Sequence, residues 1–389
     1  MTLTQLDQQY VANTYKRFDV ELSHGKGSEI FSFDGKRYID MGSGIGVTCF
    51  GIADDKWQEA VISQLGALQH TSNLYYTSPC ARLAQLLCQR TGMKKVFFAN
   101  SGAEANECAI KLARKYASDV KNLSEAYIIT LKNSFHGRTL TTLAATGQDH
   151  FHKLFQPLTP GFIHAEANDI EGVKKLCREY PVAAILFECI QGEGGVIELN
   201  EEFVKGLDEL CKKNDILLMV DEVQTGNGRT GKLYAYQNFG ITPDVVTTAK
   251  GLGGGLPIGA FICSEKCSSV LGRSHHGTTF GANPVSNAGA VAVLERLTPE
   301  FLEDVERKGE HIRKTVASWN LPCVKDIRGK GLMIGIEIEG DPHAVGTKCF
   351  EHGLLILSAG KNVVRMLPPL TISYAEIEAG LLILKSCME

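Results

Sequence analysis

The apolar segment 245–249 ends at Lys250 and leads directly into a glycine-rich turn, 251–255. Apolar and β-branched residues in a row predict a buried strand. The glycines let the backbone turn sharply and approach whatever the lysine contacts. A second apolar segment, 216–220, is followed by Asp221. In open α/β sheets, ligands bind beyond the carboxyl ends of the strands, so Lys250 and Asp221 predict a site at this edge.

A lysine and an aspartate at strand ends suit pyridoxal phosphate. The lysine amine condenses with the cofactor aldehyde, and the carboxylate keeps the pyridine nitrogen protonated so that the ring accepts electrons. The glycines at 251–255 do not have the G-x-G-x-x-G spacing, and no acidic residue follows about 20 positions later. A nicotinamide-dependent oxidoreductase is therefore disfavoured. The alternative for Lys250 alone is a solvated charge at the end of a strand.

Strand and helix patterns alternate through the middle of the chain, which predicts an α/β fold with a doubly wound parallel sheet. Near the amino terminus we expect two short strands joined at Asp34 and Gly35. From about residue 290 the chain becomes more charged and helical, then gives a hairpin-like stretch and a helix after Ser373. The expected strands are 28–33, 37–40, 96–99, 126–130, 183–187, 216–220, 245–249 and 259–262, with the hairpin at 331–338.

These patterns predict a division into two domains. Residues 51–289 form a large domain with a mainly parallel sheet flanked by helices. Residues 1–50 and 290–389 form the amino-terminal and carboxyl-terminal parts of a smaller α+β domain.

Composition excludes several classes of function. With 22% charged residues and a formal net charge of -4, nothing points to a nucleic acid or a membrane surface as partner. The 12 cysteines are scattered without a C-x-x-C pair, and no histidine pair has a carboxylate or cysteine at ligand spacing, so we expect reduced thiols and no metal site. The first residues lack the basic and apolar regions of a signal peptide, so we expect a cytoplasmic protein.

Other strand ends also carry polar residues. After 96–99, Ser101 and Glu104 have the spacing of a helix cap, and free N–H groups at such a helix start suit a phosphate. The alternative is an ordinary helix cap. After 126–130 come Phe135, His136 and Arg138, where an aromatic ring and a fork-shaped cation suit a planar cofactor and a carboxylate substrate.

Two further charges suggest a ligand site. Glu188 and Glu193 lie close in the sequence, and the glycines around Glu193 favour a strained loop over a ligand rather than an acid/base pair. Arg365 stands alone in an apolar segment. A charge in such a place is rarely unpaired, so Arg365 should meet a carboxylate of the protein or of a substrate.

With these residues in place, the whole chain resembles the class III pyridoxal-phosphate aminotransferases, and most of all the branch that acts on N2-acetylornithine. The resemblance implies a fold-type I transferase. It rests on the motifs NSGAEANE at 100–107, FHGR at 135–138, DEVQTG at 221–226, AKG at 249–251 and HGTTFG at 276–281, together with HTSNLYY at 70–76.

The resemblance implies specific roles in binding the cofactor. Lys250 would hold the cofactor and move a proton, and Asp221 would pair with the pyridine nitrogen. The other cofactor-binding residues would be Gly102 and Ala103 at the phosphate, Phe135 and Val223 on the two ring faces, Gln224 near the ring hydroxyl, Glu222 beside Asp221, and Thr279 reaching the phosphate from a neighbouring subunit of a homodimer with shared sites.

For the substrates, Arg138 would hold the α-carboxylate of the donor. Thr278 and Tyr15 would also contact the substrate. Glu193 and Arg365 would form a pair that opens when the carboxylate of 2-oxoglutarate binds. The reaction implied is a ping-pong transfer of an ω-amino group from N2-acetylornithine to 2-oxoglutarate, as in arginine biosynthesis.

Several alternatives stay open. Ornithine, succinylornithine or 4-aminobutyrate could be the donor. Ile45 lies where ornithine enzymes tend to carry an aromatic residue, which agrees with an acylated donor and also with 4-aminobutyrate. Another reaction on the same cofactor would need no keto-acid acceptor. A non-enzymatic binding module would be expected to lack Lys250 or Asp221, and both are present.

Overall fold

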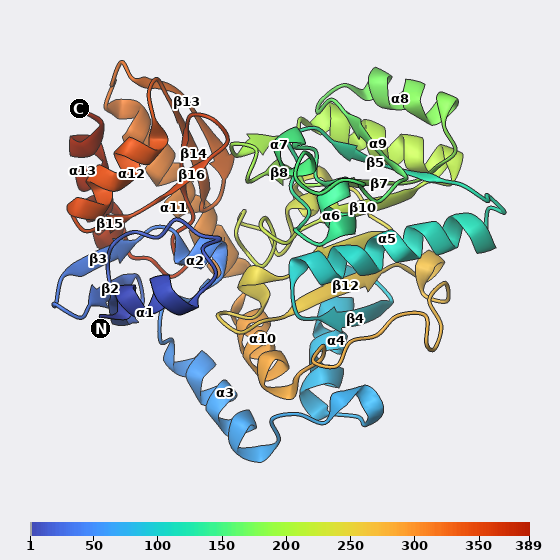
Figure 1. Cartoon of the computed structure of the whole chain (residues 1–389), viewed down its shortest axis with the longest axis horizontal. Coiled ribbons are helices and arrows are strands. Elements are labelled where there is room, and N and C mark those ends of the chain that lie inside the picture. Colours follow the sequence, from blue (N-terminus) through green and yellow to red (C-terminus); the bar gives the residue numbers. More distant parts are fainter. Residues whose placement is uncertain (1) are drawn as a thin grey trace.

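The computed structural model describes residues 2–389, and its larger part is built on a seven-stranded sheet of order β4-β12-β11-β10-β7-β5-β6 (Figure 1). Among these strands only β12 runs antiparallel to its neighbours. The predicted mainly parallel sheet is therefore confirmed. The strands are β4 (Lys95–Ala99), β5 (Tyr127–Leu131), β6 (Phe162–Ala165), β7 (Val182–Phe187), β10 (Leu217–Asp221), β11 (Val245–Thr248) and β12 (Gly259–Cys263).

Helices cover this sheet and border it. They are α3 (Asp55–Ala67), α4 (Ser78–Thr91), α5 (Gly102–Asp119), α6 (Leu140–Ala145), α7 (Asp149–His152), α8 (Ile170–Glu179), α9 (Glu201–Asn214) and α10 (Pro284–Arg296). A short antiparallel ribbon of β8 (Ile190–Gln191) and β9 (Ile197–Glu198) follows β7.

The sheet is buried on both faces because alternate residues of a strand point to opposite sides. On β10, Leu217 and Met219 belong to the apolar cluster formed with α5, whereas Leu218 and Val220 belong to the cluster that contains the residues of α9. This two-sided burial explains why β7, β10 and β11 appear in the sequence as nearly unbroken apolar segments. It also leaves the ends of the strands as the places where polar side chains can gather.

The smaller part joins the two ends of the sequence, which lie side by side in Figure 1 (blue and red). One sheet has the order β1-β2-β3-β15, so β3 from the beginning of the chain pairs with β15 from near its end. Its strands are β1 (Leu22–Lys26), β2 (Glu29–Ser32), β3 (Arg37–Asp40) and β15 (Leu354–Leu355).

The other sheet of the smaller part is antiparallel and has the order β13-β14-β17-β16. Its strands are β13 (Val324–Lys330), β14 (Met333–Ile338), β16 (Leu357–Ala359) and β17 (Val363–Met366), and the remaining helices are α1 (Leu3–Tyr10), α2 (Ser43–Gly46), α11 (Pro299–Ser318), α12 (Pro342–Glu351) and α13 (Tyr374–Met388). The domain boundaries at 50/51 and 289/290 stay a prediction.

Some local expectations need correction. The hairpin expected within 331–338 is formed by β13 and β14, so its first strand precedes that stretch. The sequence of β13, VKDIRGK, is too rich in charge to predict a strand, and the strands β1 and β6 are also unpredicted. At the start of α5, Ser101 Oγ accepts from Glu104 N as predicted, but the Glu104 carboxylate accepts from Asn100 N.

Over residues 2–389, every helix is too short or too polar to cross a bilayer. Within the same residues, no group of three or more histidine, cysteine, aspartate or glutamate side chains is arranged to hold a metal ion.

Candidate active site

Lys250 follows the carboxyl end of β11 in a backbone conformation that is unusual for its residue type. Its φ of +44° lies in the left-handed region, which costs a non-glycine residue conformational energy. Asn227 holds the preceding backbone by donating from Nδ2 to Thr248 Oγ1 (2.9 Å) and to the carbonyl of Ala249 (3.1 Å). The left-handed backbone of Lys250 and the two hydrogen bonds from the buried Asn227 side chain together determine the position from which the lysine side chain starts.

Burial lowers the pKa of the Lys250 amine. Glu193 opposes this shift, Arg365 adds to it, and Asp221 and Glu188 oppose it, with burial prevailing. A lowered pKa makes the neutral, nucleophilic amine more abundant near neutral pH.

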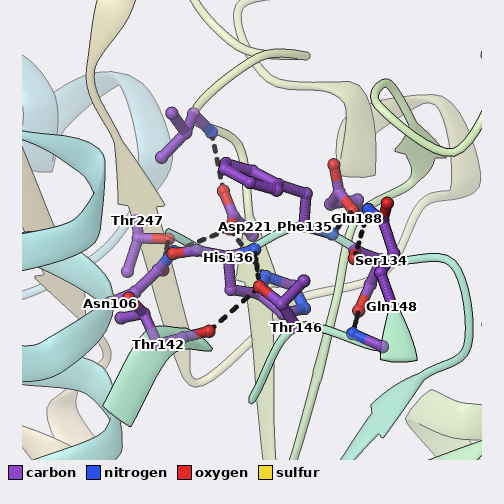
Figure 2. A network of polar contacts seen from close by, with 12 residues as sticks. Asn106, Ser134, Phe135, His136, Thr142, Thr146, Gln148, Glu188, Asp221 and Thr247 are labelled. Atoms are coloured by element: carbon purple, nitrogen blue, oxygen red, sulfur yellow. Dashed lines mark hydrogen bonds and ion pairs between the residues drawn. The ribbon is translucent and has the colours of Figure 1, made fainter. Parts of the chain in front are cut away.

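Asp221 ends β10 and is held by three donors (Figure 2). Asn106 Nδ2 donates to Asp221 Oδ2 (2.7 Å), His136 Nδ1 lies 2.8 Å from the same oxygen, and Val223 N donates to Oδ1 (3.0 Å). Thr247 Oγ1 donates to Asn106 Oδ1 (2.6 Å), which fixes the orientation of the Asn106 amide. Because a carboxylate only accepts, the proton of this contact is on His136 Nδ1.

This network contains residues for which the sequence analysis predicts no role. His136 has a fully buried side chain, and Asn106 and Thr247 are buried as well. The only signal in the sequence is a polar residue on an otherwise apolar buried face, Asn106 on α5 and Thr247 on β11. A buried polar side chain needs a hydrogen-bond partner, but the sequence does not identify which residue that partner is.

The amino terminus of α5 lies against Val223. A Cβ atom at Gly102 would be 2.7 Å from the Val223 methyl groups, so only glycine permits this approach. The N–H groups of Gly102 and Ala103, at the first two positions of the helix, have no acceptor within it. Such a helix start attracts an anion.

Phe135 and Glu188 are joined across neighbouring strand ends. The N–H of Phe135 donates to Glu188 Oε2 (2.9 Å), as Figure 2 shows. Burial and the nearby Asp221 carboxylate raise the pKa of Glu188 well above its ordinary range. Arg138 follows Phe135 closely in sequence and lies over the rings of Phe151 and Phe135.

Arg365 meets the carboxylate that the sequence predicts for it. Its guanidinium donates to Glu193 Oε1 (2.7 Å) and to Gln224 Oε1 (2.9 Å), and Gln224 Nε2 donates to Glu193 Oε1 (3.1 Å). The Arg365 side chain is 3% exposed and that of Glu193 is 30% exposed. Burial raises the pKa of Glu193, but the charge and hydrogen bond of Arg365, together with Lys250 and Gln224, outweigh burial and lower the pKa.

These residues surround two adjoining cavities that share Phe135, Arg138 and Lys250. The inner cavity has a volume of about 550 Å³, and its lining includes Gly102, Ala103, Asn106, His136, Glu188, Asp221, Val223 and Gln224. The outer cavity, about 1240 Å³, is lined in part by Tyr15, Ile45, Phe151, Glu193 and Lys361. Lys250 lies where the two meet, since it lines both the inner cavity at the start of α5 and the larger outer cavity.

Comparison with known proteins identifies the family. The model of the class-III aminotransferases matches residues 10–388. The chain belongs to the class-III aminotransferases. It is 53% identical over 384 residues to the acetylornithine aminotransferase of Haemophilus ducreyi, covering 98% of this chain and 97% of that one.

Solved structures give the same family. The ornithine aminotransferase of Toxoplasma gondii superposes with a TM-score of 0.95 at 32% identity, covering 99% of this chain and 93% of that one. The N-acetylornithine aminotransferase of Stenotrophomonas maltophilia gives 0.86 at 34% identity, with 98% and 97% covered. The chain is therefore a pyridoxal-phosphate-dependent aminotransferase of fold-type I.

The inner cavity of this aminotransferase fits the cofactor. A helix start with unpaired N–H groups suits the phosphate, a buried carboxylate suits a protonated pyridine nitrogen, and a lysine amine with a lowered pKa suits the aldehyde. The contact between Gly102 and Val223 brings the start of α5 close to the segment that carries Asp221.

Four expected site residues are absent from the lining of both cavities as residues 2–389 form them: Glu222, Thr278, Thr279 and Arg365, the last of which is paired with Glu193. Glu222 directly follows β10, and its carboxylate accepts from Thr225 Oγ1 (2.6 Å) and Tyr236 N (2.8 Å). Its expected contact with the cofactor stays a prediction. Thr278 accepts from Asn100 Nδ2 (3.0 Å), and Thr279 is exposed, so their roles stay predictions.

Proposed function

We propose that this enzyme is an N2-acetylornithine:2-oxoglutarate aminotransferase of arginine biosynthesis, producing N-acetylglutamate semialdehyde and glutamate in two half-reactions. The observation that carries the proposal is the cation of Arg138, which lines both cavities, as Lys250 does, and has no carboxylate partner within residues 2–389. The names of the H. ducreyi and S. maltophilia relatives support the same donor.

For the cofactor, we propose that Gly102 and Ala103 bind the phosphate through their N–H groups and that Asp221 faces the pyridine nitrogen. Val223 and Phe135 hold the two faces of the ring, with Gln224 near its hydroxyl. The network of Asn106, His136 and Thr247 supports this assignment, because its donors stabilise a negative charge on Asp221.

When bound, pyridoxal phosphate supplies an aldehyde that condenses with amines and an electron-accepting ring. Lys250 Nζ would hold the cofactor, and the amine of Lys250 would be free for proton transfer once the donor is bound. The same amine would remove a proton from the donor carbon that bears the transferred amine and would return a proton later. Arg138 binds the α-carboxylate of the donor by a bidentate contact, which directs the far amine toward Lys250. Tyr15, Ile45 and Thr278 contact the acylated end of the donor.

For the acceptor, we propose that the Glu193–Arg365 pair acts as a switch. The α-carboxylate of 2-oxoglutarate replaces Glu193 on Arg365, and Glu193 moves toward solvent. The greater exposure of Glu193 supports this direction of movement, and so does its loop, where Gly195 (φ +116°) and Val196 (φ +55°) adopt left-handed conformations. Gln224 keeps Arg365 in place by its own hydrogen bond.

Replacing Glu193 by glutamine is expected to lower the KM for 2-oxoglutarate by about tenfold, because Arg365 no longer has to be released from a charged partner. The donor half-reaction should slow, since the donor carboxylate can then bind Arg365 unproductively. Steady-state kinetics with each substrate varied will measure both effects. Glu201, an exposed carboxylate paired with Lys205, provides the control E201Q. Equal KM values in E193Q and wild type would rule out the switch.

The donor is tested by the absorbance of the bound cofactor. We expect N2-acetylornithine to convert the cofactor to its amine form in a single turnover, at lower concentration than ornithine, succinylornithine or 4-aminobutyrate. 2-Oxoglutarate should then restore the original spectrum, as a ping-pong mechanism requires. If another donor reacts more efficiently, the family assignment stands and the proposed donor is wrong.

We also propose a cytoplasmic homodimer with shared sites, in which Thr279 reaches the phosphate in the partner's inner cavity. The exposed apolar side chains of Leu74, Tyr75, Tyr76 and Phe280 support a protein interface. Asn73 joins their two segments by donating to the carbonyls of Thr278 and Gly281. Light scattering on the purified enzyme will give its mass, and a monomer would contradict the proposal.

The cysteines, all free thiols, support a reducing compartment.

A further inference from the structure

Arg138 is held in an unusual way for a cation that binds substrate. Its guanidinium carbon lies 4.5 Å from the centre of the Phe151 ring and 5.7 Å from that of Phe135. Within residues 2–389 it forms no ion pair and no side-chain hydrogen bond. An aromatic face attracts a guanidinium without using its N–H groups. Arg138 is therefore oriented while its donors stay free for a carboxylate.

The ring of Phe151 has a fixed position relative to the loop that carries Arg138. Phe151 lies on α7, where His152 Nε2 contacts the carbonyls of Leu143 (3.0 Å) and Thr146 (2.7 Å). The residue before α7, Gln148, is attached to the loop that carries Arg138, because Gln148 Nε2 donates to the carbonyl of Ser134 (3.0 Å). Figure 2 shows this link between Gln148 and Ser134.

Backbone contacts strengthen the same connection. Gly147 N donates to Ser134 Oγ (3.1 Å), and Asn133 N donates to the carbonyl of Gly147 (2.7 Å). The Phe135 and Phe151 rings meet at 65° with their centres 6.1 Å apart. The two rings and the guanidinium therefore form one cluster, whose Phe135 and Arg138 also face the inner cavity.

We propose that Phe151 is a positioning residue: its ring orients the Arg138 guanidinium between the two cavities, so that a donor carboxylate meets a cation that is already placed and not neutralised. A carboxylate partner in the same position would have to be displaced by every substrate, whereas the ring does not compete. This inference rests on the proposed role of Arg138 in donor binding.

The test uses binding to the holoenzyme of two unreactive analogues, N-acetylnorvaline and its carboxamide, which lack the transferred amine. In the variants F151L and F151M, which remove the ring, the Kd of N-acetylnorvaline should rise roughly 3- to 30-fold, the range expected for a lost cation–π contact. The Kd of the carboxamide should not change, and F151Y should behave like wild type. The control is F155L, on the segment after α7 and exposed.

Donor kinetics give a second readout. In F151L the KM for N2-acetylornithine should rise by the same factor while kcat and the cofactor spectrum stay unchanged. If wild type binds carboxylate and carboxamide equally, the role of Arg138 fails and this inference fails with it. If wild type prefers the carboxylate and both ring-less variants keep that preference, the inference alone is wrong. If the carboxamide weakens equally, Phe151 only maintains structure and the inference is also wrong.

Discussion

Replacing Lys250 by alanine is expected to slow amino transfer by roughly 10³-fold or more, because the general base on the donor carbon and the amine that holds the cofactor are lost together. Lys250 is the one lysine that lines both the inner and the outer cavity described here. A single-turnover experiment with N2-acetylornithine, followed by cofactor absorbance, will measure the rate. Borohydride treatment and peptide mass spectrometry will show whether the cofactor is linked to Lys250.

The matched control is Lys232→Ala, because Lys232 is exposed. K232A should keep both the rate and the linkage. If K250A retains covalently bound cofactor on another residue, or turns over at a rate near that of wild type, the assignment of Lys250 is wrong.

The same lysine predicts a pH dependence. Burial lowers its pKa below the ordinary 10.5, so its amine loses the proton at lower pH than an exposed lysine does. Only the neutral amine attacks an aldehyde. The rate at which the cofactor-free protein captures pyridoxal phosphate should therefore rise with pH through this lowered pKa and level off before pH reaches 10.5. A rise that continues beyond 10.5 would contradict the effect of burial.

The sequence predicts those features that depend on neighbouring residues. A strand buried on both faces must be an apolar segment, so β10 and β11 are recognisable, and the ionisable residue after each apolar segment is recognisable too. The cap at Ser101 is a pattern of four residues. Arg365 could be expected to have a carboxylate partner, because an isolated charge in an apolar segment needs one.

Contacts between distant residues are not predictable in this way. His136 and Asn106 converge on Asp221 from 85 and 115 positions away. No local pattern indicates that they share one oxygen, which depends on the packing of α5 against the sheet. Likewise Phe151 belongs to a four-residue helix, and its position over Arg138 depends on hydrogen bonds from Gln148 and His152.

The second large effect is expected for Asp221→Asn. The amide has nearly the shape of the carboxylate but no charge, so it no longer stabilises a protonated pyridine nitrogen. The donor half-reaction should slow roughly 10²- to 10³-fold, the usual cost of removing one electrostatic contact to a developing charge. Cofactor absorbance should also titrate at a different pH, which a purely structural change would not cause.

Stability is expected to fall less than activity. Asparagine can still accept from Asn106 and His136 through its oxygen, but its nitrogen then faces the N–H of Val223, which loses its acceptor at a cost of about 1–3 kcal/mol. Asp244→Asn is the matched control. Asp244 directly precedes β11, and its carboxylate accepts from Leu218 N, near the amino ends of β10 and β11 and so away from the site. Urea unfolding should show both variants weakened, whereas only D221N should lose the rate. Equal loss of rate in both would mean that the charge of Asp221 has no specific role, and that sheet stability alone explains the effect.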